Sequence, residues 1–304
     1  MDRLRFHIPL VLTILATLLW PASSLVGAAA EPSATVVAAL AGTPIRGIYV
    51  RPPRGAVPSG QPLQVLLLLH GMGGNGEDFA RDFADQADRY GWLLVAPSIA
   101  YGDWKDPNTL TREDPVLINA LAGFVDQLSD RTGFTSRKQV LILGHSRGAQ
   151  LAHRFAEFRP DTVLAVAALS AGDYTLPLSL SPQGSGLRFP FGVKDLASYT
   201  GRAFDPARFE AIQFWVGVGA DDTNPSDIPR QWDPFEGTTR LQRAQAFESA
   251  MQKLGASSVL RVFGGAQHEL TPEMRSAACS FLDRATHGQR SVLGGPRSEK
   301  PEPY

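Results

Sequence analysis

Apolar runs alternate with amphipathic stretches along most of this chain of 304 residues. Short apolar runs bounded by turn residues are typical of strands buried on both faces of a sheet, whereas apolar residues three or four positions apart predict helices. The expected strands are 45–50, 65–69, 92–95, 139–143, 163–168, 212–218 and 259–263. The expected helices are 77–90, 115–128, 147–158, 238–254 and 273–284. This alternation predicts an α/β fold, with a mostly parallel sheet flanked by helices.

The first 30 residues follow a different pattern. Arg3 and Arg5 precede an apolar stretch, and Pro21 interrupts it short of the roughly 20 apolar residues that a membrane-spanning helix needs. Three alanines at 28–30 then provide a small-residue cleavage site. The pattern predicts a secretory signal peptide over 1–30 and a secreted or periplasmic mature protein, with no stable membrane insertion after cleavage. The alternative is a segment retained as a membrane anchor.

Two further segments interrupt the alternation of strands and helices. Residues 173–208 are rich in Pro, Gly, Ser and Phe and contain no clear periodicity. Long irregular segments inside a compact domain are usually functional, so we expect a lid-like insertion that covers the substrate site before the strand 212–218. The tail 288–304 has several prolines and glycines and is expected to be disordered. The folded domain is therefore expected to span 31–287.

The sequence Gly-His-Ser-Arg-Gly at 144–148 directly follows an expected buried strand and precedes an expected helix. In this context G-x-S-x-G predicts a nucleophile elbow, in which a sharp turn exposes the serine hydroxyl. The two flanking glycines allow the backbone to bend where a Cβ would crowd it. Ser146 is therefore the candidate nucleophile.

A serine hydroxyl needs a general base within hydrogen-bond reach and an acid that orients that base. His268 follows the last expected strand and is the candidate base. His145 lies inside the elbow, where we expect its side chain to point away from Ser146. The histidines of the mature chain that are not favoured as the base are His70, His145, His153 and His287.

The orienting acid is expected after the strand 212–218, where Asp221 and Asp222 are adjacent and either could reach the histidine. The resulting chain order of Ser, Asp and His is that of α/β-hydrolases rather than of the chymotrypsin or subtilisin folds. Together with Asp227, these aspartates match no calcium-loop spacing, and no metal or other cofactor is expected.

Four motifs together resemble the α/β-hydrolase superfamily, and in particular its secreted serine esterases related to polyhydroxyalkanoate depolymerases and feruloyl esterases. The motifs are Leu-Leu-His-Gly-Met-Gly-Gly at 68–74, Gly-His-Ser-Arg-Gly at 144–148, Gly-Ala-Asp-Asp at 219–222 and Gln-His at 267–268. The resemblance spans roughly 44–285 and implies a single-domain α/β-hydrolase fold. It also implies that Asp222, rather than Asp221, is the acid. The cysteine pairs of the secreted depolymerases are missing, so the resemblance implies no particular polymer.

An acyl-transfer enzyme also needs two hydrogen-bond donors for the oxyanion of the tetrahedral intermediate. One is the backbone N–H of Arg147, the residue after the nucleophile. By resemblance, the second is the N–H of Met72 in the glycine-rich turn after the strand 65–69. No Gly-Lys-Ser/Thr follows these glycines, which excludes a phosphate-binding loop.

Aromatic residues near the expected site are candidates for substrate contact. Trp104 lies on the loop at the carboxyl end of a strand, the edge at which open α/β sheets bind ligands. Phe189, Phe191 and Trp232 are candidates for the wall of an apolar acyl pocket.

The composition is that of an ordinary globular protein. The formal net charge of −1 gives no electrostatic reason to expect a nucleic-acid partner. Cys279 is the only cysteine and is expected to be a small buried apolar residue rather than a catalytic thiol. We therefore expect a serine hydrolase that cleaves small-molecule or polymeric carboxylic esters through an acyl-enzyme. The alternatives are a peptidase or amidase with the same triad, and a non-catalytic binding protein on this fold.

Overall fold

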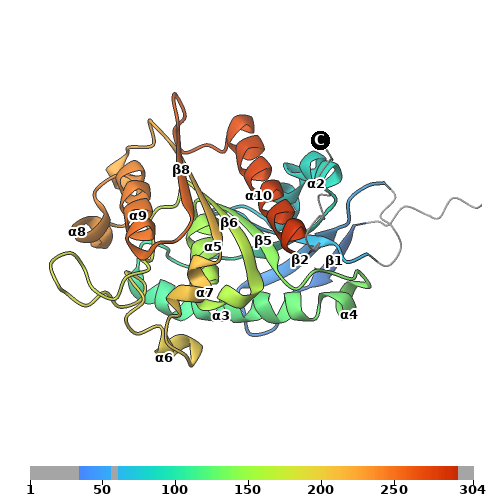
Figure 1. Ribbon diagram of the computed structural model, residues 1–304, viewed down its shortest axis with the longest axis horizontal. Helices are drawn as coiled ribbons and strands as arrows, with labels where there is room; N and C mark the ends of the chain where they lie inside the picture. Colours follow the sequence, from blue (N-terminus) through green and yellow to red (C-terminus); the bar gives the residue numbers. More distant parts are fainter. Residues whose placement is uncertain (1–33, 56–60, 294–304) are drawn as a thin grey trace, which may run out of the picture. The chain divides into compact units, whose positions relative to one another are not determined.

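The computed structural model describes residues 34–55 and 61–293, which belong to one compact unit. The expected signal peptide lies outside the described residues. An eight-stranded sheet forms the centre of the unit, with β1 and β2 antiparallel at one edge and the other strands parallel (Figure 1). The strand order is β1 (Thr35–Ala38), β2 (Ile45–Arg51), β4 (Trp92–Ile99), β3 (Gln64–Leu69), β5 (Val140–His145), β6 (Val163–Leu169), β7 (Gln213–Gly219) and β8 (Ser258–Phe263). The expected α/β architecture is confirmed.

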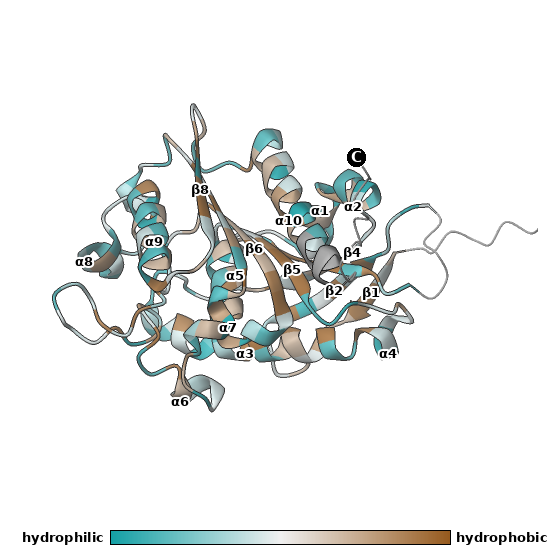
Figure 2. Ribbon diagram, viewed as in Figure 1, coloured by the Kyte–Doolittle hydropathy of each residue, from teal (hydrophilic) through white to brown (hydrophobic). Residues whose placement is uncertain are grey.

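Helices cover both faces of the sheet, and each face has its own apolar cluster. The first face carries α3 (Pro107–Asp126), α4 (Leu128–Thr132), α5 (Arg147–Phe158) and α9 (Arg240–Leu254). The second carries α1 (Gly76–Arg81), α2 (Ala84–Tyr90) and α10 (Pro272–Leu293). Three short helices are α6 (Ala197–Thr200), α7 (Pro206–Glu210) and α8 (Asp233–Glu236). Figure 2 shows apolar strands at the centre and hydrophilic residues on the outer sides of the helices.

The alternation of side chains along β3 shows why the sequence forms a doubly covered strand. Val65 and Leu67 pack into the apolar cluster of the first face, and Leu66 and Leu68 pack into that of the second. All four side chains are fully buried. A strand with both faces covered needs an unbroken apolar run, and this is the pattern that 65–69 presents.

Several boundaries differ from those expected. The helix expected over 77–90 is two helices, because Phe83 leaves the helical region with φ −114° and ψ 5° while its side chain stays buried. Helix α3 begins at Pro107 rather than at 115, because Asp106 caps its first amides and proline is favourable in the first turn. Helix α10 continues to Leu293, past the end expected at 284 and into the tail 288–304, whose disorder stays a prediction. The rest of that tail lies outside the described residues.

The insertion 173–208 lies where it was expected in the chain, but it is packed on the first face of the sheet. It begins after β6 at the carboxyl edge and continues along α5, which runs from Ser146 toward the amino edge. Its residues Tyr174, Leu187 and Phe189 are buried in the core. Contacts of the insertion follow the helix in order: Asp173 with Gln150, Phe189 with Phe158, and Arg208 with Asp161 just beyond the helix. The segment therefore leads away from Ser146.

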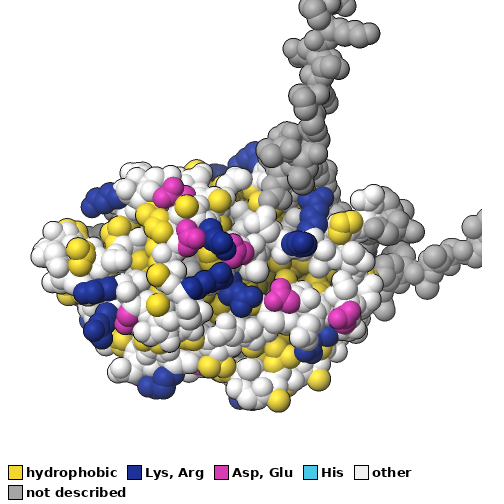
Figure 3. Space-filling view, turned by 60° about the horizontal axis from the view of Figure 1, so that its bottom comes forward, with side chains coloured by type: hydrophobic (Ala, Val, Ile, Leu, Met, Phe, Trp, Pro, Cys, Tyr) yellow, Lys and Arg dark blue, Asp and Glu magenta, His cyan; other side chains and the backbone are white. Residues whose placement is uncertain are grey.

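The charge and apolar patches of the surface do not point to a particular kind of partner. On the face shown in Figure 3, basic and acidic side chains are mixed and small apolar patches lie between them, in keeping with the near-neutral composition. Of the helices in the described residues, none has the length and apolar content that crossing a membrane would require.

Candidate active site

Ser146 stands on a sharp turn between β5 and α5, in a backbone conformation with φ 56° and ψ −119°. The flanking glycines are required by close contacts. A Cβ on Gly144 would collide with the carbonyl of Gly148, and a Cβ on Gly148 would collide with the carbonyl of Leu69. The geometry is that of the nucleophile elbow expected from the motif.

The structure brings together the three residues expected to form a triad. Ser146 Oγ lies 2.9 Å from Nε2 of His268, and Nδ1 of His268 lies 2.9 Å from Oδ2 of Asp222. Asp222 is buried, whereas the Asp221 side chain is exposed and outside this chain of hydrogen bonds. Serine can therefore donate its proton to Nε2 while Nδ1–H donates to the carboxylate, which is the arrangement a general base requires.

The loops that carry the acid and the base meet because β7 ends in a glycine. A Cβ on Gly219 would collide with the carbonyls of Ala266 and Gln267. The Asp221 N–H also donates to the Ala266 carbonyl at 2.9 Å. This close approach of the two loops positions Asp222 beside the histidine of the next loop.

His145 contacts the loop that carries the candidate base. Its Nε2 donates to the backbone carbonyl of His268 at 2.9 Å, and the two rings lie 5.2 Å apart. Burial, together with the nearby charge of His268, lowers the pKa of His145 to about 4. His145 is therefore neutral near pH 7 and serves as a donor that holds the loop carrying the base.

The other histidines are engaged elsewhere. Nε2 of His70 accepts the Ile99 N–H at 3.0 Å, which ties the loop after β3 to β4. Nε2 of His153 accepts the Thr175 N–H at 2.9 Å in the core. His287 is exposed on α10. The geometry leaves His268 as the histidine in contact with Ser146.

The two expected oxyanion donors flank the nucleophile. Arg147 is the first residue of α5, and the first amides of a helix have no partner within it. The loop after β3 comes so close that a Cβ on Gly71 would lie 3.2 Å from Cβ of Ser146. The next residue, Met72, is 45% exposed and lines the pocket at the serine. Both residues therefore lie beside Ser146, and their role as oxyanion donors stays a prediction.

A pocket of about 410 Å³ opens at Ser146. Its wall includes Trp104, and Gly172 leaves the room that the indole ring occupies. Lys105, which sequence reasoning did not single out, donates from Nζ to the Ser226 carbonyl at 2.9 Å and so joins two loops at the rim. The remaining described residues that line the pocket are Gly71, Met72, His145, Asp227, Arg240 and His268.

Phe189, Phe191 and Trp232 do not line this pocket, contrary to expectation. Phe189 is 4% exposed and packs against Phe158 and Tyr199. Phe191 packs against Trp232, which is fully buried. Their apolar character is used in the core under the insertion rather than in a substrate wall.

The candidate acid has a second partner that sequence reasoning missed. Oδ1 of Asp222 accepts a hydrogen bond of 2.8 Å from the guanidinium of Arg240, the first residue of α9. Burial acts to raise the pKa of Asp222, but the hydrogen bond from His268 and the charge of Arg240 outweigh it, so the pKa lies below its ordinary value. No short motif marks Arg240, because 18 positions separate it from the acid.

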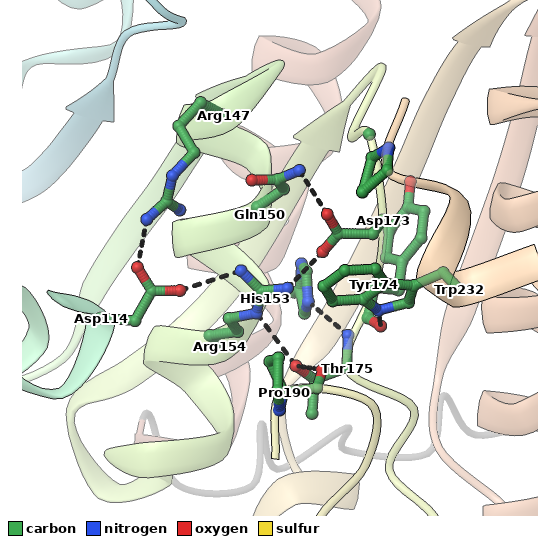
Figure 4. A network of polar contacts seen from close by, with 12 residues as sticks. Asp114, Arg147, Gln150, His153, Arg154, Asp173, Tyr174, Thr175, Pro190 and Trp232 are labelled. Atoms are coloured by element: carbon green, nitrogen blue, oxygen red, sulfur yellow. Dashed lines mark hydrogen bonds and ion pairs between the residues drawn. The ribbon is translucent and has the colours of Figure 1, made fainter. Parts of the chain in front are cut away.

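A second set of buried charges holds the nucleophile helix in place (Figure 4). Arg147 and Arg154, both on α5, form ion pairs with Asp114 of α3. Arg154 also pairs with Asp173, which accepts a hydrogen bond of 2.7 Å from Gln150. All four charged side chains are fully buried or nearly so. We call these residues the scaffold network, because they join α5 to α3 and to the start of the insertion.

Arg147 extends this support to the loop that carries Trp104. Its guanidinium lies 4.8 Å from the centre of the Tyr101 ring and 3.2 Å from Glu113, and Glu113 in turn accepts the Gly102 N–H at 2.7 Å. The side chain that follows the nucleophile therefore also positions one wall of the pocket.

Away from the site, burial raises the pKa of the Cys279 thiol to about 12, as expected of an inert core residue.

Comparisons with known proteins agree with this architecture. Among solved structures, poly(aspartic acid) hydrolase-1 from Sphingomonas sp. KT-1 is similar with a TM-score of 0.59 and 19% identity, over 84% of this chain and 98% of that one. The fluorophosphonate-binding serine hydrolase FphF of Staphylococcus aureus is similar with a TM-score of 0.53 and 15% identity, over 82% of this chain and 97% of that one. The Bacillus cereus carboxylesterase is similar with a TM-score of 0.50 and 14% identity, over 78% of this chain and 93% of that one.

At these identities the structural neighbours establish the fold alone. No sequence among the curated proteins matches the chain. The model of the alpha/beta hydrolase family matches residues 66–290, which include the elbow, both candidate acids and the candidate base. Because this match extends over most of the chain, the protein belongs to the alpha/beta hydrolase family.

Proposed function

We propose that the protein is a serine hydrolase of carboxylic esters, in which Ser146 is the nucleophile, His268 the base and Asp222 the orienting acid. The observation that carries this proposal is the continuous chain of hydrogen bonds from Ser146 Oγ through His268 to Asp222. It is formed by residues on three different loops, which the fold brings to one edge of the sheet. A binding protein on the same fold would have no need for this alignment.

The geometry defines the role of each group. Ser146 Oγ attacks the ester carbonyl carbon as His268 Nε2 removes its proton, and the N–H groups of Met72 and Arg147 stabilise the oxyanion. The tetrahedral intermediate then collapses, the alcohol leaves with the proton from His268, and an acyl-enzyme remains. Water attacks this acyl-enzyme as His268 accepts its proton, and the carboxylic acid leaves with Ser146 restored. Asp222 holds the histidine tautomer throughout.

The structural neighbours support the hydrolase part of the proposal and leave the scissile bond open. Their titles name a carboxylesterase, a fluorophosphonate-binding serine hydrolase and a poly(aspartic acid) hydrolase. The resemblance of the four sequence motifs to secreted esterases favours an ester as substrate. Together with the expected signal peptide, it leads us to propose that the enzyme acts outside the cytoplasm.

The test combines a covalent probe with two classes of substrate. Purified protein is incubated with a fluorophosphonate, with p-nitrophenyl esters of increasing acyl length and with peptide p-nitroanilides. We expect labelling at Ser146 and turnover of esters, and Ser146→Ala should lose both. Ser170→Ala is the matched control, because Ser170 is also a serine with positive φ directly after a strand, in this case β6. Labelling with anilide turnover alone would assign a peptidase or amidase, and the absence of both labelling and turnover would assign a binding protein.

A further inference from the structure

Arg240 is the one cationic side chain in direct contact with the candidate triad among the described residues. It is 3% exposed, and its guanidinium donates at 2.8 Å to Oδ1 of Asp222 and at 2.8 Å to the Asp227 carbonyl. The other carboxylate oxygen, Oδ2, accepts from His268. The two oxygens of the acid are thus divided between a base that gains charge during the reaction and a cation with a permanent charge.

This division affects both the orientation and the charge of the acid. A buried carboxylate needs a donor at each oxygen, and a single histidine contact would leave Asp222 free to rotate about its χ2 bond. Arg240 occupies the second oxygen and also binds the loop that follows the acid through Asp227. A full positive charge at hydrogen-bond distance keeps a buried carboxylate ionised and offsets part of its negative charge.

We propose that Arg240 is a positioning residue of this hydrolase that keeps Asp222 ionised and oriented toward His268 and thereby extends activity to lower pH. This inference rests on the proposed function, because it concerns the same triad. Without Arg240, Asp222 would take up a proton at higher pH. Asp222 would also attract the protonated form of His268 more strongly, because Arg240 would no longer offset part of the carboxylate's negative charge. Both effects protonate the catalytic pair earlier as pH falls, so they act in the same direction.

Other charged and titratable groups surround this pair without duplicating the contact. His145 lies beside His268 and is neutral near pH 7. Burial raises the pKa of Tyr174, so the phenol is uncharged in this range. The remaining groups nearby are Asp227, whose carboxylate accepts from Asn224, Lys105, whose Nζ is bonded to Ser226, and the exposed Asp221.

The test uses Arg240→Met, which removes the charge, and Arg240→Lys, which keeps it. The rate constant for fluorophosphonate labelling of Ser146 is measured from pH 4 to 9, together with kcat/KM for a p-nitrophenyl ester. The labelling rate reports the reactivity of the serine whatever the natural substrate is. Arg243→Met is the matched control, because Arg243 is also buried on α9 but binds Asp233 and three backbone carbonyls instead of the triad.

We expect the acidic limb of both profiles, which reports protonation of the His268–Asp222 pair, to move to higher pH by roughly one unit in Arg240→Met, because removal of a contacting cation favours protonation of the pair. Arg240→Lys should restore most of the wild-type profile, and Arg243→Met should lose stability with its limb in place. An unmoved limb in a folded Arg240→Met protein, or an equal movement in Arg243→Met, would overturn the inference. If Arg240→Met fails to fold, Arg240→Gln, which removes the charge but keeps hydrogen-bond donors, takes its place with the same expected movement and the same contradicting outcome. A wild-type protein that reacts with neither probe nor ester instead overturns the proposed function.

Discussion

The chain buries arginine–carboxylate pairs in two regions that use them differently. In the scaffold network, Asp114 lies between Arg147 and Arg154, and every carboxylate faces a guanidinium or an amide. At the candidate triad, Asp222 offers only one oxygen to its arginine and the other to His268, whose side chain is 39% exposed. The first arrangement is closed and the second ends at a pocket. An arginine–carboxylate pair can therefore hold a scaffold when both carboxylate oxygens face fixed donors. It can set the charge of a reacting group when the second oxygen faces a catalytic histidine.

Replacement of the acid should have the largest effect and should separate the two adjacent aspartates. Asp222→Asn preserves shape but donates an amide N–H or presents a neutral oxygen to His268, which favours the wrong tautomer. We expect kcat to fall by a factor on the order of 10⁴. Asp221→Asn alters an exposed side chain and should keep activity close to that of the wild type. Steady-state ester kinetics of both variants measure the difference, and a greater loss at Asp221 would reverse the assignment.

Replacement within the scaffold network should lower stability rather than alter chemistry. Asp114→Asn leaves two buried guanidinium groups without their shared anion, and the free energy of unfolding should fall by about 3–5 kcal/mol. Asp161→Asn is the control, since its ion pairs with Arg202 and Arg208 are exposed and contribute at most about 1 kcal/mol. Urea denaturation gives both values. If Asp114→Asn shifted the acidic limb of the pH profile while stability was unchanged, the division between the two regions would fail.

Replacement of a core phenylalanine in the insertion should have the smallest effect and tests whether that segment contributes to specificity. Phe189→Leu should lower the free energy of unfolding by about 1–2 kcal/mol, because it leaves a void between Phe158 and Tyr199. The ratio of kcat/KM between short and long acyl esters should stay constant. Trp104→Leu, at the pocket wall, should change that ratio. A changed ratio in Phe189→Leu would restore the role in substrate choice that the sequence suggested.

The sequence was most informative where one local feature carries the information. The elbow needs two glycines around a serine, and the contacts of Gly144 and Gly148 explain why no other residue fits there. Ser146, the aspartates at 221–222 and His268 each follow a strand of the parallel sheet, so they were expected at the same edge. The resemblance then favoured Asp222 over Asp221. These features depend on short segments and on the rules of parallel sheets, so they could be predicted.

What the sequence did not reveal depends on packing between distant segments. Arg240 begins an ordinary amphipathic helix, and only the contact between α9 and the loop after β7 places it on the acid. The apolar residues of 173–208 indicated burial, but they could not indicate whether the segment covers Ser146 or follows α5. For the same reason, nothing in the sequence indicated that His145 would donate to the loop that carries the base.

The course of the insertion along α5 has a consequence for catalysis at interfaces. Some ester hydrolases become active only at an oil–water interface, where a flap moves away from the nucleophile. Their rate then rises abruptly as substrate droplets appear. Here the segment best suited by position to be such a flap is anchored in the core, with Phe189 4% exposed. Its release would cost the contacts that Tyr174, Leu187 and Phe189 make in the core of the first face. With this segment fixed, the rate on a sparingly soluble ester should rise smoothly through the solubility limit, without an abrupt increase when droplets form.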